Sequence, residues 1–461
     1  MTVLIALLGL IFLMFVAYRG FSVILFAPVA AMIPVLLTEP SAIPTVFTGL
    51  FMAKAVVFVR LYFPIFLLGA LFGKLIELSG FSQSIAVAII RLVGAKRAIL
   101  ATVMVAAVLC YGGVSLFVVV FAVYPFGAAL FRQADIPKRL MPAALALGAL
   151  SFTMDAVPGT PQIQNIIPTT FFHTTAWAAP TIGTFGAAFI LVGGMVYLTW
   201  RARRAAGEGY GENHLNEPEM PSLEKGVPWA VAILPLVAVG VLNKVFTDLM
   251  PHAFGAKDTV SLPGLKEALV TDVPAVTGVW ALEAALLCGI LLTVALAFPI
   301  IRVRFIEGTR PAIAGALLAT MNTASEFGFG AVIAALPGFL AVRDALGGLP
   351  DPLVRAAVAT TTLAGITGSA SGGLGIALST LSGQFIASAQ AAGIPLQVMH
   401  RVVAMASGGM DDLPHNGAVI TILMVTGLTH RQSYGDIFVI TLIKTAAVFA
   451  AIGLYDATGL V

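Results

Sequence analysis

Two short segments combine acidic side chains with proline, glycine and amide residues inside otherwise apolar stretches. Residues 154–165 read MDAVPGTPQIQN, and residues 410–417 read MDDLPHNG. Proline lacks a backbone donor and glycine loosens the backbone, so a helix is expected to break at both places. The second half of a broken helix begins with unpaired N–H groups and positive dipole character, which favour a negatively charged ligand. The two segments are therefore predicted to be broken helices that bind an anion.

Two longer apolar stretches, 98–131 and 353–391, are predicted to form re-entrant helical hairpins. Each is too long for one membrane crossing, and each is interrupted by small residues, YGGVS at 111–115 and TGSAS at 367–371. A chain that enters the membrane, turns on glycine and leaves on the same side fits this length. Such a turn is tolerated only where protein or a water-filled cavity lines it. The tip of each hairpin is thus expected to face a cavity rather than lipid.

The side chains at the tips and breaks are polar but mostly uncharged. They suit a carboxylate with nearby hydroxyl groups, because no basic residue occurs within either tip or break. The simpler alternative for a serine or threonine is a bond to the carbonyl one turn back, and for His415 a hydrogen bond in the cavity without a proton role. The helices after the tips are expected to begin at Ser115 and Ser371. The predicted substrate-binding residues are Gly112, Gly113, Ser115, Thr160, Gln162, Gln164, Asn165, Thr367, Gly368, Ser369, Ser371, His415 and Asn416.

Carboxylates in the same regions are candidates for proton coupling. An ionised side chain at the centre of a bilayer costs at least about 2.5 kcal/mol, which favours a functional role. Asp155 and Asp411 occupy equivalent positions, and a plain helix N-cap is the alternative for both. The expected order of proton carriers is Asp411, Asp412 and Asp155, with Glu326 as a further candidate. His400 is expected at the membrane interface rather than in the site.

The composition requires a membrane protein to hold these segments. Of 461 residues, 59% are hydrophobic and 10% are charged, whereas soluble domains carry about 25% charged residues. The apolar residues come in blocks of about 20, enough to cross about 30 Å of hydrocarbon as a helix. The predicted fold is an all-α polytopic membrane protein with about ten transmembrane helices, two re-entrant helical hairpins and two broken helices. The spans and broken helices are expected near 3–18, 21–38, 56–78, 140–168, 178–200, 227–250, 275–300, 312–336, 397–428 and 436–457.

Other protein classes and ligands are not expected. The block 3–18 has no basic residue before it and no cleavage motif after it, so it is predicted to be a retained helix rather than a signal peptide. Cys110 and Cys288 lie in apolar runs, which disfavours a disulfide or a thiolate metal site, and no metal or cofactor is expected. The net charge of +3 is too small and scattered for nucleic acid. No H-E-x-x-H motif or other recognised catalytic arrangement is present, so an enzyme is not expected.

The chain is predicted to contain two inverted repeats, residues 1–200 and 227–461, joined by a cytoplasmic linker at 201–226. The tips and the breaks each match between the halves at an offset of 256 residues, as in Asp155 and Asp411. With the linker inside, the basic residues around the mouth of the first hairpin also fall inside, and the second hairpin opens outside. Each repeat then contains one hairpin (98–131, 353–391) and one broken helix (140–168, 397–428). Paired discontinuous elements in inverted repeats mark the midplane site of many transporters.

The chain resembles the gluconate permease family of proton symporters, within the ion-transporter superfamily. The resemblance rests on YGGVSLFVVVFAVYPF (111–126), SEFGFGAVIAALPGF (325–339) and TGSASGGLGIALSTL (367–381), and it covers essentially the whole chain. The segment SFTMDAVPGTPQIQNIIPTTFF (151–172) is similar to members described as β-hydroxybutyrate permeases and differs from gluconate and related sugar-acid members. The resemblance implies proton symport, an elevator-type movement and a homodimer.

The sequence therefore predicts a secondary active transporter in a bacterial-type cytoplasmic (inner) membrane. Its expected partners are the lipid bilayer, a small organic carboxylate and a coupling proton. The favoured substrate is 3-hydroxybutyrate, and gluconate or another sugar acid is the alternative. An uncoupled anion channel with the same architecture is the alternative from another functional class.

Overall fold

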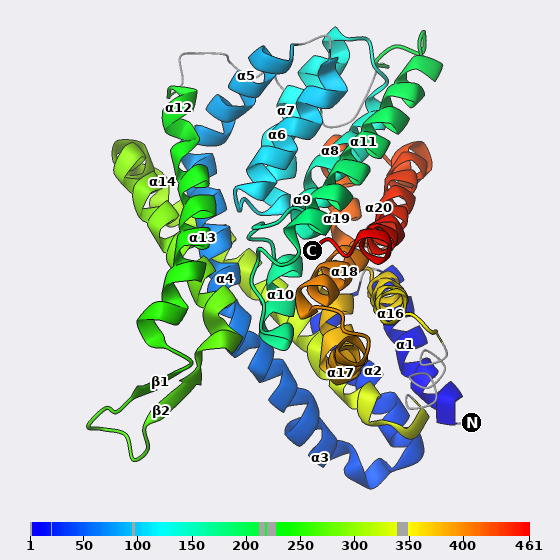
Figure 1. The fold of residues 1–461 in the computed structure, drawn as a ribbon. Helices are drawn as coiled ribbons and strands as arrows, with labels where there is room; N and C mark the ends of the chain where they lie inside the picture. The colour runs from blue at the N-terminus through cyan, green and yellow to red at the C-terminus, as the bar shows by residue number, and fades with distance from the viewer. Residues whose placement is uncertain (1, 20, 95–96, 212–216, 219–226, 339–348) are drawn as a thin grey trace.

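The computed structural model describes the chain except residues 1, 20, 95–96, 212–216, 219–226 and 339–348 (Figure 1). Half of the predicted linker, residues 212–216 and 219–226, therefore lies outside the described residues. The described chain is mainly helical, as the sequence predicts. One antiparallel β-hairpin, β1 (Lys257–Val260) with β2 (Leu269–Asp272), corrects the all-α expectation. Its paired residues include Thr259 opposite Val270, β-branched side chains that favour extended backbone.

The first half of the chain forms helices of very different lengths. Several of them end at glycine or proline, which interrupts helical hydrogen bonding. The helices are α1 (Thr2–Tyr18), α2 (Val23–Thr38), η1 (Pro40–Ala42), α3 (Ile43–Val46), η2 (Phe47–Met52), α4 (Ala53–Leu78), α5 (Phe81–Val93), α6 (Ala98–Tyr111), α7 (Leu116–Gln133), η4 (Lys138–Leu140), α8 (Met141–Ala149), α9 (Phe152–Asp155), α10 (Ile163–Phe172) and α11 (Pro180–Arg204).

The second half repeats the pattern of a helix pair followed by a helix with a break. Its helices are α12 (Trp229–Ala232), α13 (Leu234–Phe254), α14 (Val273–Ala335), α16 (Pro352–Thr367), α17 (Ala370–Ala391), α18 (Leu396–Ser407), α19 (Gly417–Thr426) and α20 (His430–Thr458). Within these bounds, α6 and α7 match the first predicted hairpin, and α16 and α17 match the second.

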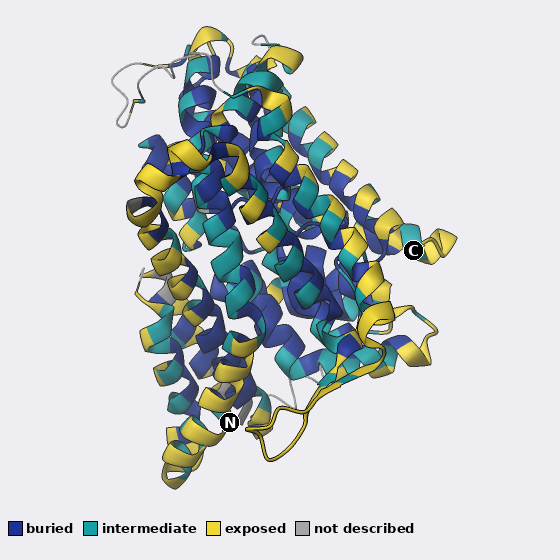
Figure 2. Cartoon of the chain, turned by 90° about the vertical axis from the view of Figure 1, so that its left-hand side faces the viewer, coloured by how far each residue is buried: buried dark blue, intermediate teal, exposed yellow. Residues whose placement is uncertain are grey.

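The outer surface is apolar enough to contact lipid. Exposed residues follow the outward faces of the long helices (Figure 2), and they include large hydrophobic side chains such as Leu291, Val303 and Ile306. Five helices in the described part are individually long and apolar enough to cross a membrane: Pro40–Leu78, Pro180–Arg204, Trp229–Phe254, Val273–Ile306 and His430–Thr458. The protein is therefore a multi-pass membrane protein, and the count of ten spans stays a prediction.

The longest helix, α14, joins two segments that the sequence predicts as separate spans. It contains 63 residues, which at 1.5 Å per residue is about 95 Å and far exceeds one bilayer crossing. Its only non-helical backbone angles occur at Ala297, followed by Pro299. This kink lies near the end of the first predicted span, 275–300, where Pro299 lacks a backbone donor.

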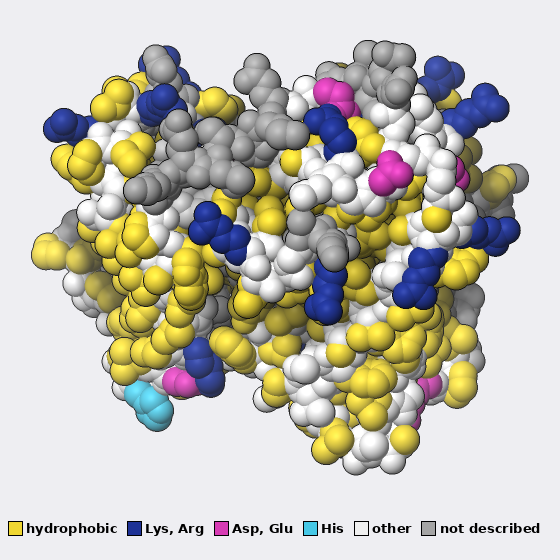
Figure 3. All heavy atoms as spheres, turned by 90° about the horizontal axis from the view of Figure 1, so that it is seen from above, with side chains coloured by type: hydrophobic (Ala, Val, Ile, Leu, Met, Phe, Trp, Pro, Cys, Tyr) yellow, Lys and Arg dark blue, Asp and Glu magenta, His cyan; other side chains and the backbone are white. Residues whose placement is uncertain are grey.

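The two helix pairs lie toward opposite ends of the molecule. In Figure 1, α6 and α7 occupy the upper part and α17 the lower part. In each half the first helix of the pair packs on the first part of the broken helix, α6 on α8 and α16 on α18. Seen from above, basic side chains are scattered over the upper face among hydrophobic ones (Figure 3). The assignment of this face to the cytoplasm stays a prediction.

Candidate functional site

The first broken helix has the interruption that its prolines and glycine predict. The helix stops at α9, which ends at Asp155, and α10 begins at Ile163. Between them the backbone turns at Gly159, with φ of +78°. Thr160 donates to the carbonyl of Thr153 at 2.6 Å, and the Asn165 amide donates to the carbonyl of Thr160 at 2.9 Å. The polar groups of Thr160 and Asn165 thus hold the shape of the break.

The second broken helix is closed by Asn416. Its side-chain oxygen accepts from the amides of Ala418 at 2.5 Å and Val419 at 3.2 Å, which makes Asn416 the N-cap of α19. Its amide group donates to the carbonyl of Asp411 at 2.9 Å. The N-cap alternative for Asp411 is therefore wrong. It is wrong for Asp155 too, since that residue ends α9 and Gln162 precedes α10.

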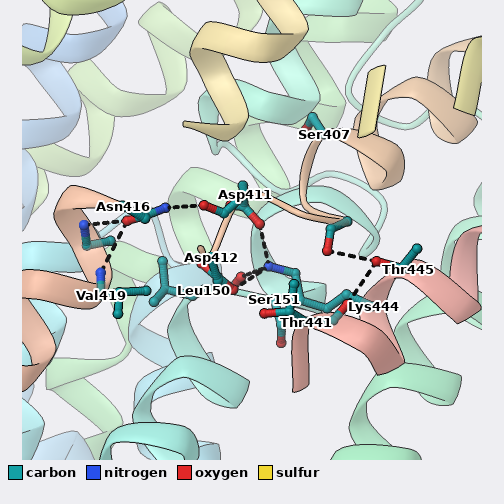
Figure 4. A network of polar contacts seen from close by, with 12 residues as sticks. Leu150, Ser151, Ser407, Asp411, Asp412, Asn416, Val419, Thr441, Lys444 and Thr445 are labelled. Atoms are coloured by element: carbon teal, nitrogen blue, oxygen red, sulfur yellow. Dashed lines mark hydrogen bonds and ion pairs between the residues drawn. The ribbon is translucent and has the colours of Figure 1, made fainter. Parts of the chain in front are cut away.

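Lys444 supplies the basic group that the sequence of the breaks lacks. Its ammonium group lies 2.9 Å from Asp411 Oδ1 and 2.7 Å from Asp412 Oδ2 (Figure 4). The third donor bonds the carbonyl of Leu150 at 2.8 Å, which belongs to the first half of the chain. All three side chains are buried. We call Lys444, Asp411, Asp412 and Asp155 the Lys444 cluster.

Asp155 completes the cluster from the first half. Its carboxylate lies against the backbone of Gly408, because a methyl group at Gly408 would meet Asp155 Oδ2. The same methyl position lies 3.4 Å from Cε of Lys444. Asp155 Oδ1 and Asp412 Oδ1 are buried and have no hydrogen-bond partner among the described residues. The two breaks are thus brought together around one lysine, with two carboxylate oxygens left unpaired.

Arg401 and His400 anchor the first break from α18. The guanidinium group of Arg401 donates to the carbonyls of Asp155, Ala176 and Ala178 and to the side-chain oxygen of Asn165. His400 bonds Thr174 at 2.6 Å and Asn165 at 3.3 Å. Both side chains are fully buried, so the expectation that His400 lies at the membrane interface is wrong.

Sequence reasoning missed Lys444 and Arg401. Each is a single basic residue in a long apolar run, LIKTAA and VMHRVV. A buried cation in such a run is costly unless a partner compensates it, and this was the available signal. The partners themselves could not be found from spacing, because Arg401 meets Asp155 from 246 residues away.

The first tip packs directly on the first break. Gln162 donates to the carbonyl of Cys110 at 2.7 Å, and Tyr111 donates to the carbonyl of Pro158 at 3.1 Å. Gly113 has φ of +91°, and a methyl group there would lie 3.4 Å from Pro161. Ser115 is the N-cap residue of α7, one residue before the helix begins at Leu116, and it makes no side-chain cap bond. A methyl group at Gly112 would instead meet Leu236.

The second tip packs on the second break in the corresponding way. Gly368 has φ of +62°, and a methyl group there would meet the ring of His415. The N-cap of α17 is Ser369, whose hydroxyl accepts from the amide of Gly372 at 3.0 Å. The expected helix start at Ser371 is thus wrong, because the helix begins at Ala370. Thr367 follows the simpler alternative and donates to the carbonyl of Leu363 at 3.0 Å.

Two further predicted residues keep polar atoms without partners. Gln164 Oε1, in the first turn of α10, and Glu326 Oε2 are buried and unpaired in the described structure. Glu326 does not join the Lys444 cluster but lies at the second tip, where a methyl group at Gly372 would meet its carboxylate. Ser371 lies beside it, 3.3 Å from the hydroxyl of Thr323.

The tips and breaks form one continuous region. The helix α10 of the first break packs against α17 of the second tip and against α18 of the second break. The described residues contain no group of three or more His, Cys, Asp or Glu side chains arranged as metal ligands. The arrangement offers helix N-termini, hydroxyls and buried carboxylates, which suit an organic anion and a proton.

Comparisons with known proteins identify the family. The model of the GntP family permease matches residues 1–270. The uncharacterized transporter YxjC of Bacillus subtilis is 55% identical over 472 residues, covering all of both chains. The crystal structure of the YdaH transporter of Alcanivorax borkumensis covers 88% of each chain at 16% identity with a TM-score of 0.53, a likeness of fold. The chain belongs to the GntP permease family and is a transporter rather than an enzyme.

Proposed function

We propose that this protein is a proton-coupled secondary active transporter for a small hydroxycarboxylate, with 3-hydroxybutyrate as the favoured substrate. The observation that carries the proposal is the junction of both tips with both breaks through contacts such as Gln162 with Cys110 and Gly368 with His415. Several helices begin in this region. The first N–H groups of a helix have no partner within that helix and can bind an anion. Broken helices of this kind hold the substrate in other transporter folds.

The groups around the tips favour a carboxylate that also carries a hydroxyl. Ser115 has no cap bond, Ser371 lies in the first turn of α17, and Gln164 keeps a buried unpaired oxygen. Gln164 Oε1 is an acceptor and therefore fits a substrate hydroxyl that donates. Lys444 and Arg401 do not compete for the substrate, because their donors bond the chain itself. The similarity of 151–172 to β-hydroxybutyrate permeases favours a short hydroxy acid over gluconate.

The Lys444 cluster is the proposed carrier of the coupling proton. Two carboxylates, Asp411 and Asp412, pair with one ammonium group, and a third, Asp155, lies close by in the same buried setting. Ionisation of all three leaves excess negative charge in a medium of low dielectric constant, and a bound proton removes part of it. We retain the order Asp411, Asp412 and Asp155 for the proton carrier. The same proposal includes two inverted repeats, an elevator-type movement, a homodimer and a location in the inner membrane.

Proteoliposome uptake with imposed proton or sodium gradients tests the function. We expect an inward proton gradient to drive accumulation of 3-hydroxybutyrate without sodium. Asp411→Asn should retain exchange of substrate across the membrane but lose gradient-driven accumulation, because only the titrating group is removed. A strict sodium requirement, or uptake that equilibrates without concentrating substrate as in a channel, would reject proton coupling.

Competition among related anions tests the substrate. Butyrate lacks the hydroxyl of 3-hydroxybutyrate and should bind about 1–3 kcal/mol more weakly, since a buried partner is left unpaired. Gluconate serves as the sugar-acid competitor. Equal binding of butyrate and 3-hydroxybutyrate contradicts the hydroxyl-recognition part of the proposal, and tighter binding of gluconate would favour the alternative substrate.

A further inference from the structure

Glu326 of α14 points its carboxylate at the beginning of α17. Its side chain is 3% exposed. A methyl group at Gly372 would meet Oε2, Cδ and Oε1 of this carboxylate. The carboxylate therefore rests directly on the backbone of the first turn of α17, an approach that only glycine permits.

Both sides of this contact lack other partners. Glu326 Oε2 has no hydrogen-bond partner in the described structure. The amides of Ala370 and Ser371 are the first two of a 22-residue helix and have no acceptor among the described residues. The next two amides are satisfied by Ser369, at 3.0 Å for Gly372 and 2.9 Å for Gly373. An unpaired buried carboxylate thus faces a helix N-terminus with unpaired donors.

Among the described residues, the helices that pack on α14 bring no buried cation to the Glu326 carboxylate. The neighbouring helices α2, α10 and α17 carry no ionisable side chain. The ionisable residues of α4 and α13, which also pack on α14, are exposed or engaged elsewhere. They are Lys54 and Arg60 (exposed), Tyr62 (bonded to Thr170), the pairs Lys74–Glu77 and Lys244–Asp248, and His252 (exposed). The positive end of the α17 dipole is therefore the group that compensates the charge of Glu326.

We propose that Glu326 is a resident anion, which occupies the carboxylate site at the second tip until the substrate displaces it. This inference rests on the proposed function and assigns the substrate's carboxylate to the N-terminus of α17. The incoming anion brings one negative charge, and Glu326 loses one by binding a proton supplied by the buffered solution. The N-terminus of α17 then faces one negative charge in both states. Binding of one anion is thereby linked to uptake of one proton, independently of the Lys444 cluster.

Calorimetry in two buffers with different heats of ionisation measures this proton uptake. Purified wild type, Glu326→Gln and the control Glu283→Gln, a half-buried carboxylate on the same helix, are titrated with 3-hydroxybutyrate, butyrate and gluconate. We expect Glu326→Gln to take up about one proton fewer per bound anion than wild type and the control. With rising pH, the affinity of wild type should fall more steeply than that of Glu326→Gln, with a difference of up to about tenfold per pH unit. Unchanged proton uptake in Glu326→Gln would overturn the proposal.

Hydrogen–deuterium exchange of residues 368–376 tests the contact without any substrate. Loss of the resident anion should speed exchange of the first amides of α17 several-fold in Glu326→Gln but not in Glu283→Gln. Equal exchange in all three proteins contradicts the proposal even if transport is intact. If wild type binds none of the three anions, the substrate class is wrong, and the exchange measurement alone decides whether Glu326 occupies this N-terminus.

Discussion

The two buried cations Lys444 and Arg401 are compensated in different ways. Lys444 directs its three donors at two carboxylates and one carbonyl, so its charge is balanced by opposite charges. Arg401 directs its donors at neutral oxygens, three backbone carbonyls and Asn165. A group bonded to neutral oxygens cannot lose its partner by protonation, whereas an aspartate can. We therefore assign Arg401 to holding the break and the Lys444 cluster to responding to protons.

Lys444→Met should lower the thermal unfolding temperature strongly, because Asp411 and Asp412 would remain buried without a counter-charge. Removing one partner of a buried pair costs about 3–5 kcal/mol. The triple variant D411N/D412N/K444M should recover part of this loss, since the two carboxylates that lost their counter-charge are then neutral amides. Lys244→Met is the matched control: its pair with Asp248 is exposed and should contribute at most about 1 kcal/mol. Equal unfolding temperatures for the two lysine variants would contradict the buried pairing.

The proposed site is formed by the ends of helices rather than by their central turns. In each half a glycine at a tip brings the backbone against a residue of the adjacent break, Gly113 against Pro161 and Gly368 against His415. The two halves are not identical at this level. The N-cap of α17 bonds through its side chain, and that of α7 does not. The second tip therefore has a side-chain cap that the first tip lacks.

Gly368→Ala should reduce uptake sharply, because the new methyl group meets His415 and the backbone is left-handed there. Gly393→Ala controls for the backbone strain alone. It also has a positive φ, of +67°, but nothing lies within 4 Å of the added methyl group. We expect both variants to lose about 1–2 kcal/mol of stability from strain. Only Gly368→Ala should lose most of its initial uptake rate in proteoliposomes. Similar uptake in both variants would place the second tip away from the substrate.

Proline and glycine in the sequence predict where helices are interrupted, whereas tertiary contacts determine which residues meet at each interruption. The breaks at 155–162 and 408–416 follow from proline and glycine in the sequence, which act on the backbone directly. Lys444 meets Asp411 and Asp412 only because α20 folds back against the second break, and no spacing in the sequence encodes that distance. Glu326 reaches Gly372 for the same reason.

The errors at the level of elements have equally specific causes. Only a kink at Ala297, close to Pro299, separates the two predicted spans 275–300 and 312–336, so they form one element, α14. The helix start at Ser371 followed from the repeat offset, whereas the side chain of Ser369 caps the helix two residues earlier. The β-hairpin at 257–272 lies among exposed residues, where no hydrophobic periodicity toward a core marks a strand.

At the scale of the whole molecule, charged contacts join several elements at the end that carries the linker. Glu217 bonds Lys138 at 2.7 Å and also contacts Arg132 and Tyr210. Next to them, Asp436 of α20 pairs with Arg201 of α11 at 2.6 Å. The described part of the linker is thus tied to the end of α7 and to η4, at the mouth of the first hairpin.

Glu217 should make the stability of this end depend on pH. Partial burial on its own raises the pKa of Glu217, but the hydrogen bond and charge of Lys138, together with Tyr210 and Arg132, outweigh it and hold the pKa below the ordinary value of 4.5. A carboxyl whose pKa is lower in the folded state stabilises that state above about pH 4.5 and loses this effect as the pH falls through the lowered pKa. Glu217→Gln should therefore unfold at a lower temperature than wild type at pH 7, and the difference should shrink below pH 4.5.

Thermal unfolding of wild type, Glu217→Gln and Glu208→Gln at a series of pH values measures this effect. Glu208 also pairs with a basic residue of the same region, Arg139 at 2.8 Å, but its side chain is 51% exposed. Solvent screens such a pair, so Glu208→Gln should differ little from wild type at any pH. A difference between wild type and Glu217→Gln that stays constant from pH 7 to pH 4 would show that Glu217 acts by packing rather than by charge. If Glu208→Gln instead lowered the unfolding temperature strongly, the exposed pair of Glu208 with Arg139 would be the contact that stabilises the linker against the hairpin mouth.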